Sequence, residues 1–177
     1  FPIYDKDKSD ISIAHCPERV IPGNIIYEIV HLNRIVGGIS KECTENAFNL
    51  YSIFSQGMII KTNSKTAELA KLTENSFRDV NIAFANEMSI ICNKINVDVN
   101  ELLKICNLHP RVNILEPGCG VGGHCIAIDP WFIVNSFPKD SQLIKTAREV
   151  NERKTLYVID KIYETLIQED LPELVIM

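Results

Sequence analysis

The segment 64–93 restricts the fold more than any other part of this sequence. It contains neither glycine nor proline, and it opens with Ser64, a residue type that caps helices. The segment therefore predicts one long helix. Its apolar residues form a surface wider than a single neighbouring helix would cover, so we expect it to pack between several elements or between subunits. These residues are Leu69, Leu72, Val80, Ala83, Phe84, Met88 and Ile91.

The segments before this helix have a different character. Residues 11–16 alternate between apolar and polar and stop at Pro17, which predicts a strand. A short strand with a glycine turn at 34–38, a helix over 40–55 and another strand over 58–61 follow. This order predicts the later part of a parallel α/β sheet whose first strands are missing.

The remainder of the sequence predicts more helices. Asp98 and Glu101 are spaced as a capping pair for a helix that includes Leu102 to Cys106. Further helices are expected over 126–134 and 141–151 and onward to about 168, the last two as separate helices or one bent rod. Residues 171–177 are apolar and predict a strand. The expected fold class is α+β and mainly α.

The stretch 116–131 carries the strongest candidate for chemistry. Four of the eight glycines of the chain lie within six residues here, so the backbone can adopt positive φ and lie close to a ligand. Cys125 follows at the expected start of a helix, where the helix N-terminus stabilises a thiolate. Asp129 comes four residues later and would share a helical face with the sulfur. This pattern predicts a nucleophilic cysteine.

Other interpretations of the same stretch were considered. Gly118, Gly120 and Gly123 match the dinucleotide motif G-x-G-x-x-G, with Asp140 about 20 residues on. Pro117 directly precedes the first glycine, Pro130 is expected to break the following segment, and no second strand precedes Asp140. The match is therefore interpreted as false.

A metal site at the same place is not favoured, and no metal is predicted. Cys119, His124, Cys125 and Asp129 include no C-x-x-C or H-x-x-x-H pair. A third interpretation is a glycine-rich turn with an inert core cysteine.

Two further sets of polar residues are candidates. Glu18 and Arg19 follow the end of a predicted strand, where an open α/β sheet places its ligand crevice. The alternative for them is a solvated ion pair. Lys71 and Asn75 are four residues apart on the long helix, with Arg78 three further on, and could polarise a substrate oxygen. Their alternative is a solvated stripe.

Composition excludes several classes of protein. The chain has 177 residues, of which 46% are hydrophobic and 23% charged, and a net charge of -5. Without a long basic run, nucleic acid and anionic membrane are not expected partners. No apolar stretch reaches the length of a membrane span, and no signal peptide is recognisable. Six cysteines without framework spacing indicate reduced thiols and a cytoplasmic protein.

Four motifs together resemble the nucleotide-sugar 6-dehydrogenases, the family of the UDP-glucose and GDP-mannose enzymes. Within that family, the segments 75–87 and 109–115 are most similar to members that act on UDP-N-acetyl-D-mannosamine. The resemblance covers nearly the whole chain. The motifs are Cys16-Pro17-Glu18-Arg19 with Pro22-Gly23, residues 34–38, Ala67 to Leu72 with Asn75, and Gly122-Gly123-His124-Cys125 with Asp129.

The resemblance implies a domain organisation. Residues 1–62 would be the C-terminal part of an NAD-binding Rossmann-like domain. Residues 63–177 would be a central all-α dimerisation domain with a linker helix, which implies a homodimer. The first part of the NAD domain and a C-terminal domain would be missing.

The resemblance also implies a reaction, the oxidation of the sugar C6 alcohol of a UDP-sugar to a carboxylate with two NAD+ reduced. An aldehyde cannot release hydride until a nucleophile adds to it, and Cys125 is the matching thiol. Glu18 matches the carboxylate that assists thioester hydrolysis. Lys71 and Asn75 match groups that stabilise an oxyanion, and Asp129 matches an acid that orients water or Lys71.

The resemblance is weaker for the substrate contacts. Arg111 lies near an arginine that reaches the substrate from a partner subunit in relatives, although its spacing to the cysteine differs. Ile128 replaces a lysine of the UDP-glucose enzymes, which favours a different sugar. The expected substrate-binding residues are Arg19, Arg78, Arg111, Gly122, Gly123 and His124.

Three alternative functions stay open at this point. The isolated chain could be a non-catalytic dimerisation module, inactive without the first NAD-binding turn. The parent enzyme could act on UDP-N-acetylglucosamine or UDP-glucose instead. A Cys-His hydrolase using Cys125 with His109 or His124 has little support, because no oxyanion-hole pattern accompanies it.

Overall fold

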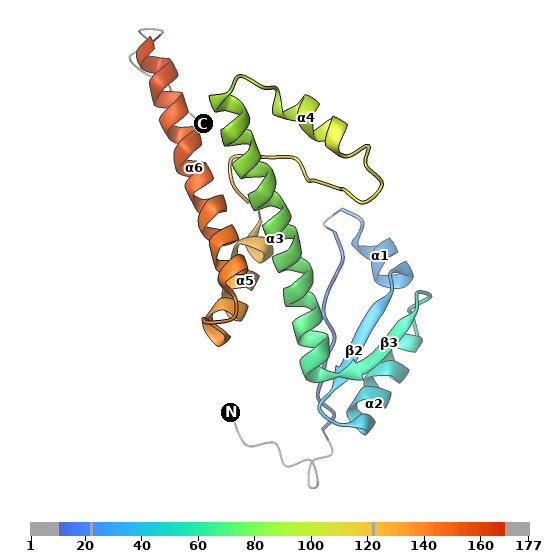
Figure 1. Ribbon diagram of the computed structural model, residues 1–177. Coiled ribbons are helices and arrows are strands. Elements are labelled where there is room, and N and C mark those ends of the chain that lie inside the picture. The colour runs from blue at the N-terminus through green and yellow to red at the C-terminus, as the bar shows by residue number, and fades with distance from the viewer. Residues whose placement is uncertain (1–10, 22, 122, 169–177) are drawn as a thin grey trace. The chain divides into compact units, whose positions relative to one another are not determined.

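The computed structural model describes residues 11–21, 23–121 and 123–168, and it divides after Thr73 into two compact units. Gly122 and the strand expected over 171–177 lie outside the described residues. Helix α3 (Ser64–Lys94) gives its first turns to the first unit and the rest to the second (Figure 1). The predicted long helix is therefore confirmed. The fold is mainly helical with a small sheet, as expected from the sequence.

The first unit is built on a three-stranded sheet in the order β1-β2-β3. Its strands are β1 (Ala14–His15), β2 (Arg34–Gly38) and β3 (Ile59–Asn63). Strands β2 and β3 are parallel, as predicted, but β1 runs antiparallel to β2. The prediction of an all-parallel sheet is wrong for β1. The connecting helix α1 (Ile25–His31) has no buried residue, so it does not cover the sheet as a parallel crossover requires.

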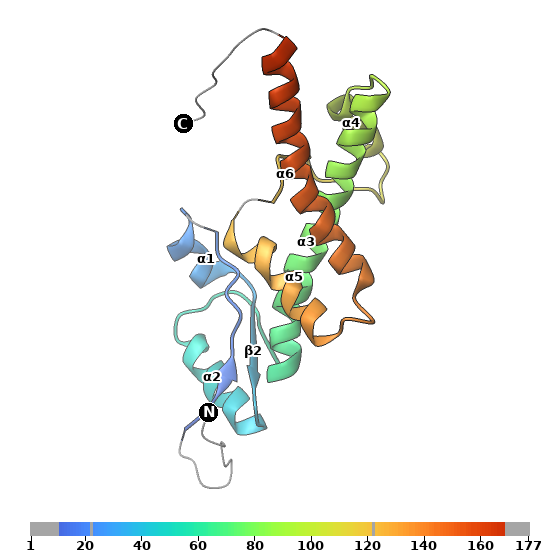
Figure 2. The ribbon, with the colours of Figure 1, turned by 90° about the vertical axis from the view of Figure 1, so that its left-hand side faces the viewer.

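Helix α2 (Lys41–Ser52) packs on this sheet through an unusually close approach (Figures 1 and 2). The Ser40 hydroxyl caps it by accepting from the Cys43 N–H. A Cβ at Gly38 would lie 2.4 Å from the Thr44 nitrogen, and one at Gly37 would lie 2.4 Å from the Asn63 carbonyl oxygen. The two glycines at the end of β2 are thus required by packing.

Helix α1 was not predicted. It is short and its Ile25 and Ile26 are exposed, so no buried periodicity marks it in the sequence. The Glu28 carboxylate stabilises it by accepting from the Ile21 N–H (2.7 Å) and from the Asn24 side-chain amide (3.3 Å).

The start of α3 differs by one residue from the expected cap. The Asn63 side-chain oxygen accepts from the Thr66 N–H at 2.9 Å, and Ser64 is already the first helical residue. Asn63 therefore satisfies the free N–H groups of the first turn. The helix ends near Asn96, which has a positive φ of 55°.

The second unit is helical. Its other helices are α4 (Val99–Cys106), α5 (His124–Ser136) and α6 (Gln142–Gln168). Asp98 caps α4, as predicted, by accepting from the Asn100 N–H. Of the two options left open for residues 141–168, the structure shows one continuous helix. Helix α6 lies along α3, as both ribbon views show (Figures 1 and 2).

Helix α5 continues through Pro130 to Ser136, so the expected break at this proline is wrong. A proline inside a helix removes one backbone hydrogen bond and costs roughly 3 kcal/mol relative to alanine. Pro130 is fully buried, and its packing offsets part of this cost.

The contact between α3 and α6 combines small apolar residues with polar ones. Ala83, Ala147 and Val150 form its apolar cluster, with Val80 packed against it. Phe84 and Ile91 of α3, which were expected to contribute to a wide apolar surface, are exposed. In contrast, several polar side chains of α3 and α6 are buried: Asn75, Asp79, Asn86, Arg148 and Asn151.

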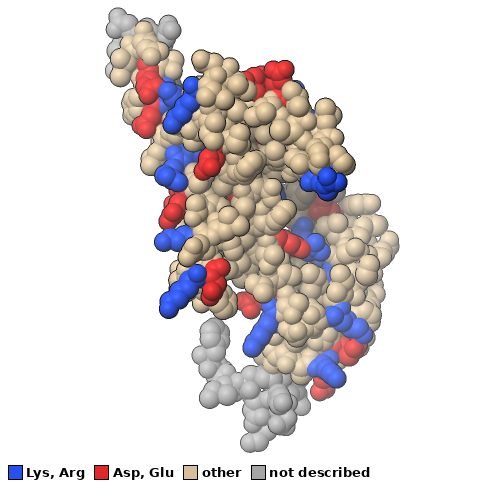
Figure 3. Space-filling model, in the orientation of Figure 1, with Lys and Arg blue, Asp and Glu red and all other residues tan. Residues whose placement is uncertain are grey.

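The surface carries charges of both signs. On the face shown in Figure 3, acidic and basic groups alternate along α6. Among the described residues, no helix is both long enough and apolar enough to cross a lipid bilayer.

Candidate active site

Cys125 is the second residue of α5 and its side chain is exposed. Gly123 precedes the helix as its N-cap with a φ of 84°, and a Cβ there would meet no atom within 4 Å. Glycine is thus favoured at this position by backbone conformation rather than by lack of space. The sulfur is therefore presented at the start of a helix and is not sealed in a core, as an inert cysteine would be.

Asp129 follows Cys125 by one helical turn and is tied to α3. One of its carboxylate oxygens, Oδ2, accepts from the Asn75 side-chain amide at 2.5 Å. Asn75 is buried, whereas Asp129 is half-buried. The family resemblance implies that Asp129 orients water or Lys71; in the structure, Asp129 accepts a hydrogen bond from Asn75. An acid and an amide are thereby held one turn from the thiol.

The glycine segment before Cys125 is hydrogen-bonded to α3 and α6 at two consecutive residues, and the next residue packs closely against α6. The Gly118 N–H donates to Asn86 Oδ1 at 2.8 Å, and the Thr155 hydroxyl donates to the Cys119 carbonyl at 2.8 Å. A Cβ at Gly120 would lie 2.7 Å from Thr155 Oγ1. The segment therefore lies tightly against the two long helices.

Behind this segment lies a buried polar network. Asp79 Oδ1 accepts from Arg148 Nη1 (2.6 Å) and from Asn151 Nδ2 (2.8 Å). Asn151 Oδ1 in turn accepts from Asn86 Nδ2 at 2.9 Å. Burial raises the pKa of Asp79 above its ordinary value, and the charge of Arg148 partly offsets this effect. Within the described part of the chain, Asp79 Oδ2 and Arg148 Nε have no hydrogen-bond partner.

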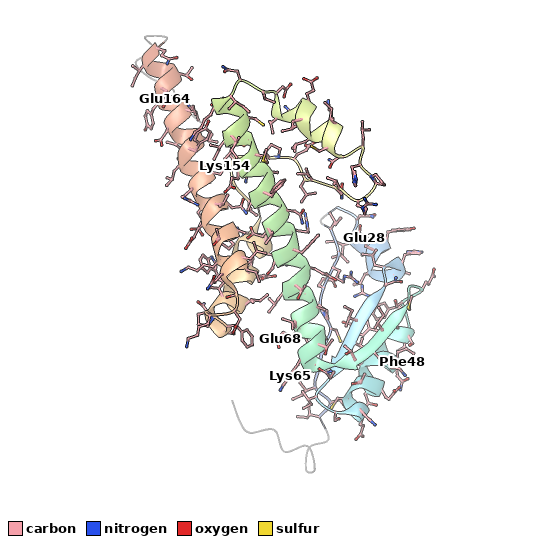
Figure 4. The ribbon with its side chains drawn as sticks, in the orientation of Figure 1. Glu28, Phe48, Lys65, Glu68, Lys154 and Glu164 are labelled. Atoms are coloured by element: carbon pink, nitrogen blue, oxygen red, sulfur yellow. The ribbon has the colours of Figure 1, made fainter. Side chains whose placement is uncertain are left out.

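A buried lysine extends the polar contact between the two helices. Lys154, labelled in Figure 4, donates to the Ser89 hydroxyl of α3 at 2.6 Å. Its ammonium also lies 5.0 Å from the Tyr157 ring centroid. Burial lowers the pKa of Lys154, because desolvation penalises its charged form.

In the first unit, Glu18 is held by its own loop. Its Oε1 accepts from the N–H groups of Arg19 (2.6 Å) and Val20 (2.9 Å). Its Oε2 lies 3.7 Å from Arg34 Nη1, and its side chain is 54% exposed. The carboxylate is therefore oriented yet open to water, which is the condition a group that activates water requires.

Arg34 is the residue that supports this loop. It is buried, it donates twice to the Ile29 carbonyl, and its guanidinium lies 5.3 Å from the Tyr51 ring centroid. Cys16, which neighbours this group, has its pKa raised by burial. These contacts make Arg34 a rigid neighbour of Glu18.

The other residues predicted from the sequence to take part in the site lie on different helices and loops. Lys71 is half-buried and lies one turn before Asn75 on α3. Arg78 is exposed on α3, and Arg111 is exposed on the loop after α4, where its N–H donates to His109 Nδ1. His124 is the exposed first residue of α5. Arg19 donates to the Asn33 carbonyl at 3.3 Å.

The alternative motifs receive no support from the geometry. The described residues of 107–123 contain no strand, so no strand leads into the glycine stretch as a dinucleotide-binding turn requires. In the described ranges, no group of three or more His, Cys, Asp or Glu side chains is arranged to hold a metal ion.

Sequence reasoning missed the supporting residues. Asn86, Asn151 and Thr155 hold the glycine segment, and Arg34 lies beside Glu18. The available signal was a polar residue recurring at helical spacing, as in Asn75, Asp79 and Asn86. Such a row of uncharged amides and one acid along a single helical face indicates buried polar contacts.

Two models of one protein family match parts of this chain. A model described as "UDP-glucose/GDP-mannose dehydrogenase family, central domain" matches residues 65–153. A second, the NAD binding domain of the same family, matches residues 3–55.

Two named proteins are similar to most of this chain. The chain is 61% identical over 162 residues to the UDP-N-acetyl-D-mannosamine dehydrogenase of Campylobacter jejuni, covering 92% of this chain and 40% of that protein. It is 57% identical, over 92% of this chain and 38% of the other, to an NDP-N-acetyl-D-galactosaminuronic acid dehydrogenase of Ralstonia nicotianae. The chain thus spans about 40% of the length of these relatives.

A solved structure shares the fold. The UDP-D-ManNAc dehydrogenase of Pyrococcus horikoshii superposes with a TM-score of 0.83 at 44% identity, over 89% of this chain and 38% of that one. Since the central-domain model alone matches half of the sequence, including the segment that carries Cys125, the chain belongs to the UDP-glucose/GDP-mannose dehydrogenase family.

Proposed function

We propose that the longer protein carrying this chain is an NAD-dependent dehydrogenase that oxidises the C6 alcohol of UDP-N-acetyl-D-mannosamine to the uronate. The observation that carries this proposal is the presentation of Cys125 at the start of α5, one turn from an Asp129 that Asn75 holds in place. The names of the similar Campylobacter and Pyrococcus proteins support the sugar.

NAD is supported as the cofactor by the match of residues 3–55 to the family's NAD binding domain. The two glycines that end β2 leave no room for its diphosphate. The glycine pair that ends β2 is filled by the chain's own atoms, since added Cβ atoms at Gly37 and Gly38 would meet Asn63 and Thr44. The candidate side chains are therefore assigned to the UDP-sugar and its oxidation.

Cys125 is assigned as the nucleophile. Its sulfur adds to the carbonyl carbon of the C6 aldehyde, forming a C–S bond, and the carbonyl oxygen takes up a proton, which yields a thiohemiacetal. Oxidation of this adduct to a thioester would release a hydride, for which bound NAD+ would be the acceptor. Water then breaks the C–S bond, which releases the carboxylate and returns the thiol.

The surrounding residues are assigned to charge and proton handling. Asn75 and Asp129 are positioned as a pair near the thiol, and their roles are to stabilise the oxyanion and to accept a proton. Lys71, one turn away on α3, is assigned to the oxyanion as well. Glu18, oriented by two backbone N–H groups, is assigned to the water of the thioester hydrolysis.

We assign the anionic diphosphate and the sugar hydroxyls to positively charged and backbone donors, because these match an anionic ligand. The residues are Arg19, Arg78, Arg111, Gly122, Gly123 and His124.

We also propose the domain assignment and assembly implied by the sequence, with residues 1–62 in the NAD domain and 63–177 in a central dimerisation domain. Phe77, Phe84 and Ile91 support a homodimer, because they recur every seven residues on α3 and are 68%, 52% and 42% exposed. The isolated chain is proposed to be inactive, and the parent enzyme cytoplasmic.

Replacement of Cys125 by Ser in the full-length protein tests the function. The variant should form no uronate, whereas Cys106→Ser, a matched change on α4, should retain native rates of NADH formation. Undiminished uronate formation by Cys125→Ser would refute the assignment.

A second sugar is favoured by one observation, the 57% identity to an N-acetyl-D-galactosaminuronic acid dehydrogenase. A panel of UDP-sugars, with kcat/KM measured for each, separates the two. The proposal requires the highest kcat/KM for UDP-N-acetyl-D-mannosamine, and a higher value for the galactosamine, glucosamine or glucose substrate would replace it.

A further inference from the structure

The cysteine segment is fastened to α3 on both sides of Cys125. On one side, the Gly118 N–H donates to Asn86, and on the other, Asp129 accepts from Asn75. Asn75 and Asn86 are eleven residues apart on one helix, which corresponds to about 16 Å along its axis. The rigid helix therefore sets the distance between the two attachment points, and Cys125 lies between them in the chain.

The hydrogen bond between Gly118 and Asn86 is oriented by the buried carboxylate of Asp79. Asp79 Oδ1 is an acceptor, so the amide of Asn151 must turn its Nδ2 toward it and its Oδ1 toward Asn86. Asn86 must then present Nδ2 to Asn151, which leaves its Oδ1 for the Gly118 N–H. The direction of every amide in this series follows from the carboxylate.

Arg148 keeps that carboxylate in place. Its guanidinium donates to Asp79 at 2.6 Å, and its side chain is 5% exposed while that of Asp79 is fully buried. Burying both charges costs free energy, and a nonpolar pair of similar volume would often be as stable. A polar network does impose one arrangement on its members, which packing of alanine and valine alone does not.

A second contact acts on the next residue of the segment. The Thr155 hydroxyl donates to the Cys119 carbonyl at 2.8 Å, and Thr155 lies one turn after Asn151 on α6. The segment is thus held by both long helices, through a backbone N–H at 118 and a backbone carbonyl at 119.

We propose that the buried series Asp79–Asn151–Asn86, together with Thr155, positions Cys125 by fixing the backbone of residues 118–120. Asn86 and Thr155 are positioning residues in this scheme and do not touch the substrate. The inference rests on the proposed role of Cys125 as nucleophile. It adds that the alignment of α3 with α6 controls the geometry of the thiol.

Two pairs of variants in the full-length enzyme test the inference. Asn86→Ala removes the acceptor of the Gly118 N–H, and its control is Asn81→Ala, whose amide donates to the Phe77 carbonyl within α3. Thr155→Val removes the hydroxyl at nearly constant volume, and Thr155→Ser restores it. Thr165→Val is the control on α6, since that hydroxyl donates to the Lys161 carbonyl of the same helix.

We expect Asn86→Ala and Thr155→Val to lower kcat by about 10- to 100-fold, because small misplacements of a reacting group have effects of this size. KM for the UDP-sugar should stay within about twofold. Thr155→Ser and both controls should keep native kcat. The inference is wrong if a folded Thr155→Val variant keeps native kcat, or if Thr155→Ser fails to recover it. These two outcomes decide the question even if Asn86→Ala does not fold.

A readout independent of turnover separates this inference from the proposed function. The alkylation rate of Cys125 by iodoacetamide, followed by peptide mass spectrometry, should change by about threefold or more in Thr155→Val, while that of Cys106 stays constant. An unchanged Cys125 rate would overturn the positioning role. If Cys125→Ser retained full activity, the proposed function would fail, yet the alkylation result would still decide the positioning role.

Discussion

The interiors of the two units of this chain are stabilised by different kinds of contact. The sheet unit is held by close backbone approach, with glycines at the end of β2 against α2 and the first turn of α3. The helical unit is held by side chains, and charged and amide groups lie where α3 meets α6. The first interior is sensitive to added volume, and the second is sensitive to a lost partner.

The largest effect should come from breaking the buried charge pair. Arg148→Met leaves the Asp79 carboxylate buried without its cation, which we expect to lower the free energy of unfolding by about 3–5 kcal/mol. Urea unfolding measures this change. Arg153→Met, at an exposed position of the same helix, is the control and should be nearly neutral. The double variant with Asp79→Leu should recover most of the loss; no recovery would mean that Arg148 acts mainly through packing.

The next effect should come from added volume in the sheet unit. Gly37→Ala places a Cβ 2.4 Å from the Asn63 carbonyl oxygen, so strands and helix must shift, at a cost of about 1–3 kcal/mol. Gly118→Ala is the matched control in the helical unit, because its nearest atom is 3.6 Å away and its N–H is retained. Thermal unfolding of both variants tests the comparison, and equal destabilisation would contradict it.

A change of pH should have a smaller effect on the free energy of unfolding, because it changes the charge of Asp79 without removing a side chain. Burial raises the pKa of Asp79 in the folded chain, so the folded state binds its proton more tightly than the unfolded state. This contribution to stability is fully present below the unfolded pKa of about 3.9 and is lost as pH rises through the folded pKa.

Asp79→Asn removes this titration while keeping an acceptor for Arg148. The stability difference between the native protein and the variant should therefore decrease as pH rises from about 4 toward neutrality. Urea unfolding of both proteins across this range measures the difference. A difference that increases with pH would indicate that Arg148 dominates the carboxylate.

The smallest effects on stability should come from surface ion pairs, which occur within each of the two units. Lys61 lies 2.9 Å from Glu45 in the sheet unit, and Lys145 lies 3.8 Å from Glu149 on α6. Because both pairs are solvated, Lys61→Met and Lys145→Met should each change stability by less than about 1 kcal/mol. If both stability changes are small, the difference between the two units lies in their interiors. A large change for either variant would show that surface charges contribute to the difference.

Much of the local structure could be predicted. Helix α3 lacks glycine and proline, and its expected length is confirmed; the Asp98 cap of α4 follows the same local logic. Helix α1 and the direction of β1 could not be predicted, because they depend on how an exposed connection returns to the sheet. Helix α5 passes through Pro130 because that residue is buried, which no local pattern reveals.

For the candidate site, the sequence by itself determined the chemical groups: a thiol after four glycines, an acid one turn later, and a lysine and an amide on a long helix. These follow from spacing along a single element, where geometry is set by the helical repeat. Only the tertiary structure decided the partners, such as Asn75 with Asp129 and Asn86 with Asn151. These pairs are 54 and 65 residues apart in the chain, and such contacts depend on how whole helices align rather than on any local preference.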